Sequence, residues 1–311
     1  MPTVHVLMST YNGEKFIAEQ LDSILRQTGV SVKLYIRDDG STDRTFPILE
    51  QYAAGDDRII LARGENLGPG KSFMQLLKTV PDAAYYAFAD QDDVWMEDKL
   101  DRAVRLIREK EQSEERTLPI LYASNQMLVD ADLHEIGIRF KTPPALDFYE
   151  LLSRNMIYGC TMVLNHTLRT VCAVAPMPRD QVLRAKNHDA WVLYAGMLAG
   201  EVIYDHESRI LYRQHGENVV GGIRPSGFAI VTDRMKRLTA RRKRGVRSML
   251  AGDLLKAFSD YMDASVKEHL VILENADSLT GAVKLIRDPV LKRSFRESTP
   301  MILFRGLIRW I

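Results

Sequence analysis

Three carboxylates lie together in the run Asp90-Gln91-Asp92-Asp93, directly after the apolar segment 85–89. Like charges at this spacing repel one another unless a cation lies among them. Oxygen ligands favour a hard metal such as Mg²⁺ or Mn²⁺, which would bridge the two phosphates of a nucleotide diphosphate and stabilise the charge on a leaving group. The run therefore indicates a metal site or, as the simpler alternative, a solvated turn.

Two further polar clusters each follow an apolar segment. Thr10, Tyr11 and Asn12 offer a hydroxyl, an aromatic face and an amide, which suit a nucleobase and a ribose but equally suit the start of a helix. Asp38 and Asp39 are adjacent carboxylates, one of which could accept a hydrogen bond from a base N–H or a ribose hydroxyl. Taken alone, each cluster is also typical of an ordinary turn or helix cap.

Two candidates stand farther along the chain. Asp189 lies near the start of an expected helix that holds Val192, Leu193 and Met197, so it is either a helix cap or a general base that takes a proton from an acceptor hydroxyl. His215 is either a ligand of the metal or the diphosphate, through a ring nitrogen, or a surface histidine beside a loop.

The elements that must position these residues alternate along the chain. We expect strands at 4–8, 32–36, 59–62, 85–89, 120–123 and 157–164, and helices around 16–25, 46–52, 73–77 and 100–107. The segments 201–204 and 210–215 close the acidic part of the chain. This alternation predicts an α/β fold, a mostly parallel sheet flanked by helices. Ligands bind at the carboxyl ends of such strands, so the polar clusters should converge on one crevice.

The net charge of +1 hides an uneven distribution. Residues 224–311 carry 18 basic and 9 acidic side chains, whereas the first 223 carry 24 and 32. We therefore expect two domains, an acidic one at 1–222 and a helical, basic C-terminal region at 223–311. The balanced total gives no reason to expect a nucleic-acid partner.

The basic run 234–247 and the apolar terminus 301–311 have two interpretations. They fit an anionic membrane surface, where lipid-linked acceptors lie, and they fit nearly as well a contact between two subunits of a homodimer. The N-terminus lacks the pattern of a signal peptide, and no stretch is apolar for long enough to span a bilayer. Because Cys160 and Cys172 lie in apolar segments, we expect a reduced, cytoplasmic protein. From the basic run and the apolar terminus we expect it to be peripheral at the inner face of the membrane.

The order of the clusters carries more information than any one of them. Thr10-Tyr11-Asn12, the run 38–43, Asp90-Gln91-Asp92-Asp93, His188-Asp189-Ala190-Trp191 and Tyr212-Arg213-Gln214-His215 together resemble the inverting glycosyltransferases of family 2, which have the Rossmann-like GT-A fold. The resemblance covers roughly residues 3–222. The motifs at residues 90–95 and 212–216 are similar to those of bacterial polysaccharide rhamnosyltransferases.

The resemblance implies a role for each candidate. Thr10, Tyr11, Asn12, Asp38 and Asp39 would hold the nucleotide of a nucleotide-diphosphate sugar. Asp92 and His215 would hold Mn²⁺ or Mg²⁺ at the diphosphate, with Asp90 close by, and Asp189 would be the base. The reaction would be a single in-line displacement with inversion.

The resemblance also implies the reaction partners. The leading donor is dTDP-rhamnose, and the acceptor would be a hydroxyl of a lipid-linked or growing bacterial surface polysaccharide. The Gln-x-x-Arg-Trp signature of processive members is absent, because Gly306 stands where the Gln would precede Arg309-Trp310, so addition of one or a few sugars is expected. The alternatives are a non-catalytic sugar-nucleotide-binding scaffold at the membrane and a nucleotidyltransferase.

Overall fold

The computed structural model describes residues 1–114, 117–154, 156–215, 245–276 and 278–295. The chain forms two compact units, each built from segments that are not contiguous in sequence. The first unit holds Met1–Ala145, Met156–Ala175 and Lys186–Arg213, and the second holds Leu146–Asn155, Pro176–Ala185 and the chain from Gln214 onward. The boundary expected at 222/223, most of the basic run 234–247 and the terminus 301–311 lie outside the described residues.

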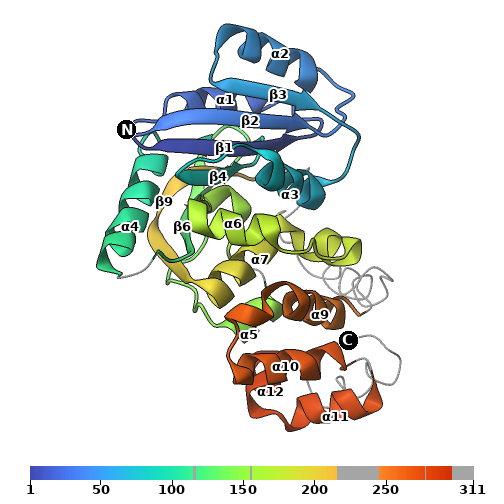
Figure 1. The fold of residues 1–311 in the computed structure, drawn as a ribbon. Helices are drawn as coiled ribbons and strands as arrows, with labels where there is room; N and C mark the ends of the chain where they lie inside the picture. The colour runs from blue at the N-terminus through green and yellow to red at the C-terminus, as the bar shows by residue number, and fades with distance from the viewer. Residues whose placement is uncertain (115–116, 155, 216–244, 277, 296–311) are drawn as a thin grey trace. The chain divides into compact units, whose positions relative to one another are not determined.

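A nine-stranded sheet is the centre of the first unit (Figure 1). The strands run in the spatial order β3-β2-β1-β4-β8-β6-β9-β5, and β7 pairs with β6. Their bounds are β1 Thr3–Thr10, β2 Ser31–Asp38, β3 Ile59–Arg63, β4 Tyr85–Ala89, β5 Val94–Trp95, β6 Ile120–Val129, β7 Glu135–Ile138, β8 Val163–Asn165 and β9 Glu201–Arg213.

The sheet is parallel from β3 to β4 and mixed beyond it. The pairs β1–β2, β2–β3, β1–β4 and β6–β9 are parallel, whereas β8 pairs antiparallel with both β4 and β6, and β5 pairs antiparallel with β9. The α/β fold with a flanked sheet is confirmed. The sheet is thus parallel across the four strands β3, β2, β1 and β4, three of which end in the polar clusters, and again at β6–β9, but it is mixed elsewhere.

Helices cover both faces of this sheet. Their bounds in the first unit are α1 Ile17–Leu25, α2 Thr45–Gly55, α3 Pro69–Thr79, α4 Lys99–Ser113, α6 His166–Val174 and the second part of α7 Asp180–Ala199. Figure 1 shows α3 and α6 side by side, and they contact β1 and β4. On the opposite face Val4, Val6 and Met8 of β1, at alternate positions, share one core with Ile17 and Leu21 of α1.

The apolar run of β1, which is buried on both faces, and the helical spacing of α1 explain why both elements form where the sequence predicts them. One predicted strand is wrong in detail. The run 157–164 holds a short 3₁₀ helix, η1 Gly159–Thr161, before the three residues of β8. Every residue of this run is buried or partly buried, so hydrophobicity alone does not place the start of the strand. The segments 201–204 and 210–213 are parts of the single strand β9.

The second unit is helical. Besides the first part of α7 it holds α5 Phe148–Ser153, α9 Val246–Phe258, the 3₁₀ helix η3 Ser259–Tyr261, α10 Ala264–Glu274, α11 Leu279–Arg287 and α12 Pro289–Phe295. Side chains of Asp263 and Ser278 cap α10 and α11 by accepting hydrogen bonds from Val266 and Gly281 backbone N–H groups. The helical character expected of the C-terminal region is confirmed for the described part of it.

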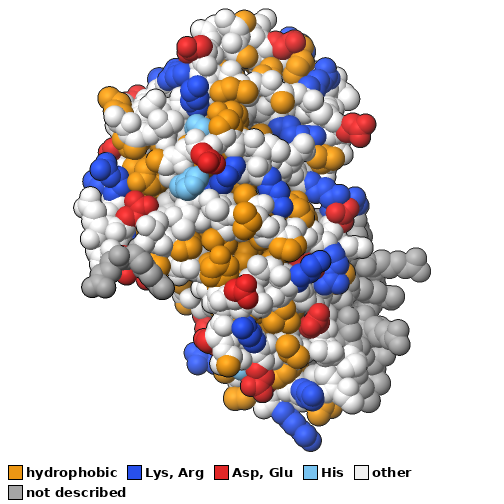
Figure 2. All heavy atoms as spheres, viewed as in Figure 1, with side chains coloured by type: hydrophobic (Ala, Val, Ile, Leu, Met, Phe, Trp, Pro, Cys, Tyr) orange, Lys and Arg blue, Asp and Glu red, His pale blue; other side chains and the backbone are white. Residues whose placement is uncertain are grey.

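The described helices include none that combines the length and the apolar character needed to cross a bilayer. On the face drawn in Figure 2, Lys and Arg side chains alternate with Asp and Glu, and hydrophobic side chains lie in small groups between them. Both cysteines are buried and free, as expected.

Candidate active site

The carboxyl ends of β1, β2 and β4 bring the three polar clusters together. Thr10 ends β1 opposite Asp38, which ends β2, and the Thr10 hydroxyl donates a hydrogen bond to Asp38 Oδ2 at 3.2 Å. The loop after β4 reaches the loop after β1 through Gln91, which is hydrogen-bonded to the Tyr11 backbone. The loops after these parallel strands therefore converge, as expected.

Asp38 and Asp39 are buried at the end of β2 and accept hydrogen bonds from the chain itself. Asp38 accepts from the Ser41 backbone N–H at 3.0 Å. Asp39 is ion-paired with the Arg37 guanidinium and accepts from the backbone N–H groups of Leu67 and Gly68 at 2.9 and 2.8 Å. These bonds order the loop before α3. The sequence analysis did not single out this loop, although Gly68, at φ 78°, followed by Pro69 is a typical helix start.

Tyr11 and Asn12 directly follow β1 and are exposed. The Tyr11 side chain is 46% exposed. Asn12 has a positive φ of 49°, its side-chain Oδ1 accepts from the Thr42 backbone N–H at 2.8 Å, and its own N–H donates to Ser41 Oγ at 3.0 Å. The Tyr11 ring is thus presented to solvent on a backbone that its neighbours hold.

The acidic loop between β4 and β5 crowds carboxylates together. Burial, and after it the charges of Asp92 and Asp189, raise the pKa of Asp90 to about 7. Burial and the charges of Asp92 and Asp90 likewise raise the pKa of Asp93 well above its usual value. The structure therefore brings Asp189, which is 99 residues away in the chain, into the electrostatic range of the acidic loop.

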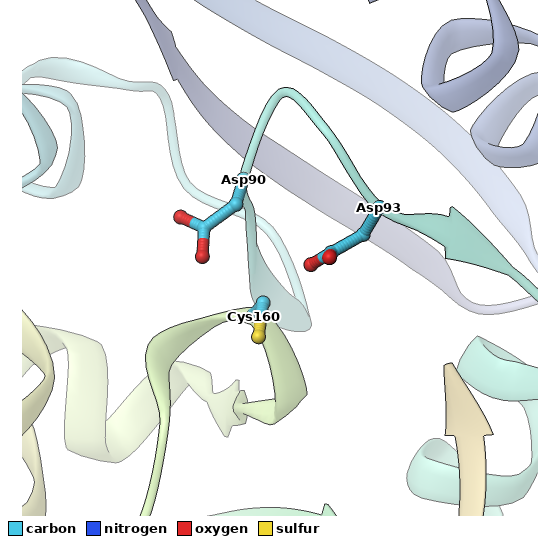
Figure 3. A group of neighbouring side chains, drawn as sticks. All are labelled: Asp90, Asp93 and Cys160. Atoms are coloured by element: carbon cyan, nitrogen blue, oxygen red, sulfur yellow. The ribbon is translucent and has the colours of Figure 1, made fainter. Parts of the chain in front are cut away.

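Asp93 differs from its neighbours in what it contacts. It is fully buried, its Oδ1 accepts from the Arg213 backbone N–H at 3.2 Å, and its Oδ2 has no hydrogen-bond partner. Figure 3 shows its carboxylate turned back under the loop toward Asp90 and Cys160, and one ligand atom of each lies within 4.8 Å of the others. The pKa of the Cys160 thiol is raised by burial and by Asp93 and Asp90, so this sulfur stays protonated and is a poor metal ligand.

The cluster fits a hard divalent cation. Lys99 is a buried cation near it, but burial lowers the pKa of its ammonium to about 7, so Lys99 is a weak counter-charge at neutral pH. Repulsion among buried carboxylates is relieved either by protonation or by a cation. The unpartnered Asp93 oxygen and the raised pKa of Asp90 both fit a hard divalent cation bound at the acidic loop.

Asp189 lies where α7 is broken. Asn187 interrupts the helix with φ 60° and ψ 178°, so a new helical segment begins at His188-Asp189, as the sequence predicts. Asp189 is buried, and its Oδ1 accepts from the Ala190 N–H at 2.7 Å. Asp189 therefore lies at a helix start, and its carboxylate is also close enough to raise the pKa of Asp90.

His215 follows β9 by two residues and is half-buried. It belongs to the second compact unit, whereas Asp92 belongs to the first, so a cation site shared by these two residues stays a prediction.

The chain is similar to known glycosyltransferases. The family model "Glycosyl transferase family 2" matches residues 5–114. The dTDP-rhamnosyl transferase RfbG of Shigella flexneri is 32% identical over 224 residues, which cover 69% of this chain and 73% of that protein. The chain belongs to glycosyltransferase family 2. It is therefore an enzyme of the glycosyltransferase class.

Solved structures support the fold of this glycosyltransferase. S. aureus TarS 1-349 in complex with UDP-GlcNAc has a TM-score of 0.58 at 16% identity, with coverage of 99% of this chain and 82% of that one. The mannosyltransferase PcManGT from Pyrobaculum calidifontis, in complex with GDP-Man and Mn²⁺, has a TM-score of 0.50 at 16% identity, with coverage of 99% and 74%. At these identities the likeness establishes the GT-A fold.

Sequence reasoning missed three residues that shape the site of this glycosyltransferase. Gln91 bridges two loops, and Gly159 leaves room for His188 and Asp189, since a Cβ there would lie 2.7 Å from His188 Nε2 and 3.3 Å from Asp189 Cβ. The third, Arg213, is a buried cation whose guanidinium donates to the Asp92 carbonyl at 2.9 Å. All three lie within or beside motifs that were singled out, but their contacts depend on the fold.

Proposed function

We propose that this glycosyltransferase is inverting and metal-dependent, and that it transfers a sugar from a nucleotide-diphosphate donor to a hydroxyl of a lipid-linked or growing bacterial surface polysaccharide. The observation that carries the proposal is the convergence of Asp90, Asp92 and Asp189 beside the Thr10–Asp38 pair. The leading donor is dTDP-rhamnose, because the relative RfbG bears the name of a dTDP-rhamnosyl transferase.

The loops after β1 and β2 are the proposed nucleotide site. The exposed ring of Tyr11 offers a stacking face for a base, Thr10 and Asn12 offer a hydroxyl and an amide, and Asp38 and Asp39 lie beneath them. Structures of TarS with UDP-GlcNAc and of PcManGT with GDP-Man support a nucleotide sugar as the ligand of this fold.

Asp92 and His215 are the proposed ligands of Mn²⁺ or Mg²⁺, with Asp90 at the donor. The raised pKa of Asp90 supports a cation at this point, and the PcManGT complex contains Mn²⁺. The cation, when bound, neutralises charge that develops on the diphosphate as it leaves.

Asp189 is the proposed base. An acceptor hydroxyl placed against its carboxylate would lose its proton to Asp189 while its oxygen attacks the anomeric carbon of the donor. The bond from that carbon to the diphosphate breaks on the opposite side, so the configuration inverts and the nucleoside diphosphate leaves. Burial of Asp189 protects this step from bulk water.

The two predicted domains have separate proposed roles. We propose that residues 1–222 form the catalytic domain and that the basic region 223–311 holds the enzyme at the cytoplasmic face of the membrane, or at a second subunit. Flotation with vesicles of anionic lipid tests the membrane contact. A bound fraction that depends on neither the lipid charge nor the salt concentration would contradict it.

Replacement of Asp189 tests the proposed base. In Asp189→Asn we expect turnover to fall by about 100-fold or more, because general-base catalysis is typically worth that much, while the donor dissociation constant stays within about 2-fold. The donor is whichever of dTDP-rhamnose, UDP-glucose and UDP-GlcNAc the wild type uses fastest, and binding is measured by calorimetry. Asp57→Asn, at an exposed carboxylate after α2, is the charge-matched control. Full turnover by Asp189→Asn would show that the base is another group.

A further inference from the structure

Gln91 lies within the acidic loop, but its side chain pairs with a different loop. Its Oε1 accepts a hydrogen bond from the Tyr11 backbone N–H at 2.8 Å, and its Nε2 donates to the Tyr11 backbone carbonyl at 3.0 Å. One side-chain amide thus satisfies both polar groups of one backbone residue, as a neighbouring strand would do. This pairing joins the loop after β1 to the loop after β4.

The chain around Tyr11 is shaped to admit this amide. A Cβ at Gly13 would lie 2.5 Å from both Cδ and Oε1 of Gln91, so a side chain at position 13 would push the amide away. The Gly13 N–H donates to Thr45 Oγ1 at 2.7 Å, which holds the loop from the other side. The backbone of Tyr11 is therefore fixed between Gln91 and the start of α2, while its ring remains exposed.

We propose that Gln91 is a positioning residue that holds the Tyr11 ring ready for the base of the donor while its neighbours Asp90 and Asp92 face the diphosphate. The inference rests on the proposed function, because it takes a nucleotide to be the ligand of both loops. A loop held in its bound conformation loses less entropy when the ligand arrives, so affinity rises without a new contact to the ligand.

A role in stability alone would leave a different signature. The two hydrogen bonds lie at the exposed rim, where such bonds contribute little to the free energy of unfolding. A residue that only stabilised the fold would not change nucleotide affinity at a temperature where the protein is fully folded. Nor would its effect depend on whether the Tyr11 ring is present.

The first measurement needs no ligand. In Gln91→Ala we expect hydrogen exchange of the peptide that contains the Tyr11 amide to speed up by about 3-fold or more, since the acceptor of that N–H is gone. Gly13→Ala should have the same effect by displacing the amide. Gln75→Ala, the same truncation at an exposed position of α3, is the control and should leave that peptide unchanged.

The second measurement is binding of UMP and dTMP in EDTA, where the acidic loop has no cation to hold. We expect Gln91→Ala to weaken binding by about 3- to 10-fold, the value of one or two hydrogen bonds that order a loop. In a Tyr11→Ala background the same substitution should change the dissociation constant by less than about 2-fold, because the group it positions is absent.

The outcomes separate the inference from the function beneath it. Unchanged exchange in Gln91→Ala, or an equal loss of affinity with and without the Tyr11 ring, would overturn the positioning role. If the wild type binds neither nucleotide while exchange still speeds up in Gln91→Ala, the coupling of the two loops is supported and the proposed nucleotide function fails.

Discussion

His188 is a neutral histidine held inside apolar packing next to the proposed base. Its ring stacks on Phe73 with centroids 4.0 Å apart, neither ring nitrogen has a hydrogen-bond partner, and burial lowers its pKa to about 3. The motif His188-Asp189 placed both residues at a helix start from sequence alone. The opposite roles of the two side chains, one packed as a hydrophobe and one within reach of Asp90, follow only from the break at Asn187.

This histidine makes a pH-dependent contribution to stability. The unfolded chain protonates His188 near its ordinary pKa of 6.5 and the folded chain only near 3, so folded-state stability is complete above pH 6.5 and is lost as the pH falls. Between pH 7 and pH 5 the wild type should lose about 2 kcal/mol more than His188→Phe, at about 1.4 kcal/mol per pH unit below 6.5.

Urea unfolding of both proteins at the two pH values measures this difference. Phe keeps an aromatic ring against Phe73 and Phe88, so the comparison isolates the titration. An identical loss in both proteins would mean that His188 is charged in the folded state.

Strand β9 shows what element-level patterns can and cannot predict. In the sequence the segments 201–204 and 210–215 stand apart, because the polar stretch 205–209 lies between them. In the structure Asp205 is buried and ion-paired with Arg102, so the polar residues belong to the strand. The four parallel strands at the start of the chain were predicted because apolar residues dominate each of them, whereas pairings such as β4–β8 depend on contacts that no local pattern encodes.

Arg213 ends β9 and connects it to the acidic loop. Its buried guanidinium donates to the carbonyls of Asp92 and Ala131 and to Glu19 Oε2, and it lies over the Phe16 ring at 4.4 Å. Arg213→Met should lower the free energy of unfolding by about 3 kcal/mol, because two backbone carbonyls lose their donor at about 1–3 kcal/mol each.

Arg209→Met is the matched control on the same strand. Arg209 is ion-paired with Asp98 and Glu207, both of which are more than half exposed, so the change should cost less than about 1 kcal/mol. Denaturant unfolding of the two variants measures the difference. Equal losses would show that the contacts of Arg213 are not what fixes the end of β9.

At the scale of the whole molecule, the sequence predicted an acidic α/β part followed by a basic helical part. The two compact units agree in character, but the second also takes in Leu146–Asn155 and Pro176–Ala185 from the middle of the chain. Charge counts average over contiguous stretches, so they cannot reveal segments that leave one unit and return. The family resemblance rests instead on five short motifs in order, three of which follow β1, β2 and β4 in the first unit.

Donor-dependent release of nucleoside diphosphate by the purified protein tests the proposed metal-dependent use of a sugar nucleotide most directly. A panel of dTDP-, UDP- and GDP-sugars is assayed with Mn²⁺, with Mg²⁺ and with EDTA, and binding is followed in parallel by calorimetry. We expect slow release of nucleoside diphosphate from one donor, with dTDP-rhamnose the leading choice, in the presence of a divalent cation and no release in EDTA. Release that is equally fast in EDTA, or no binding of any donor across the panel, would contradict a metal-dependent sugar-nucleotide site at Asp92.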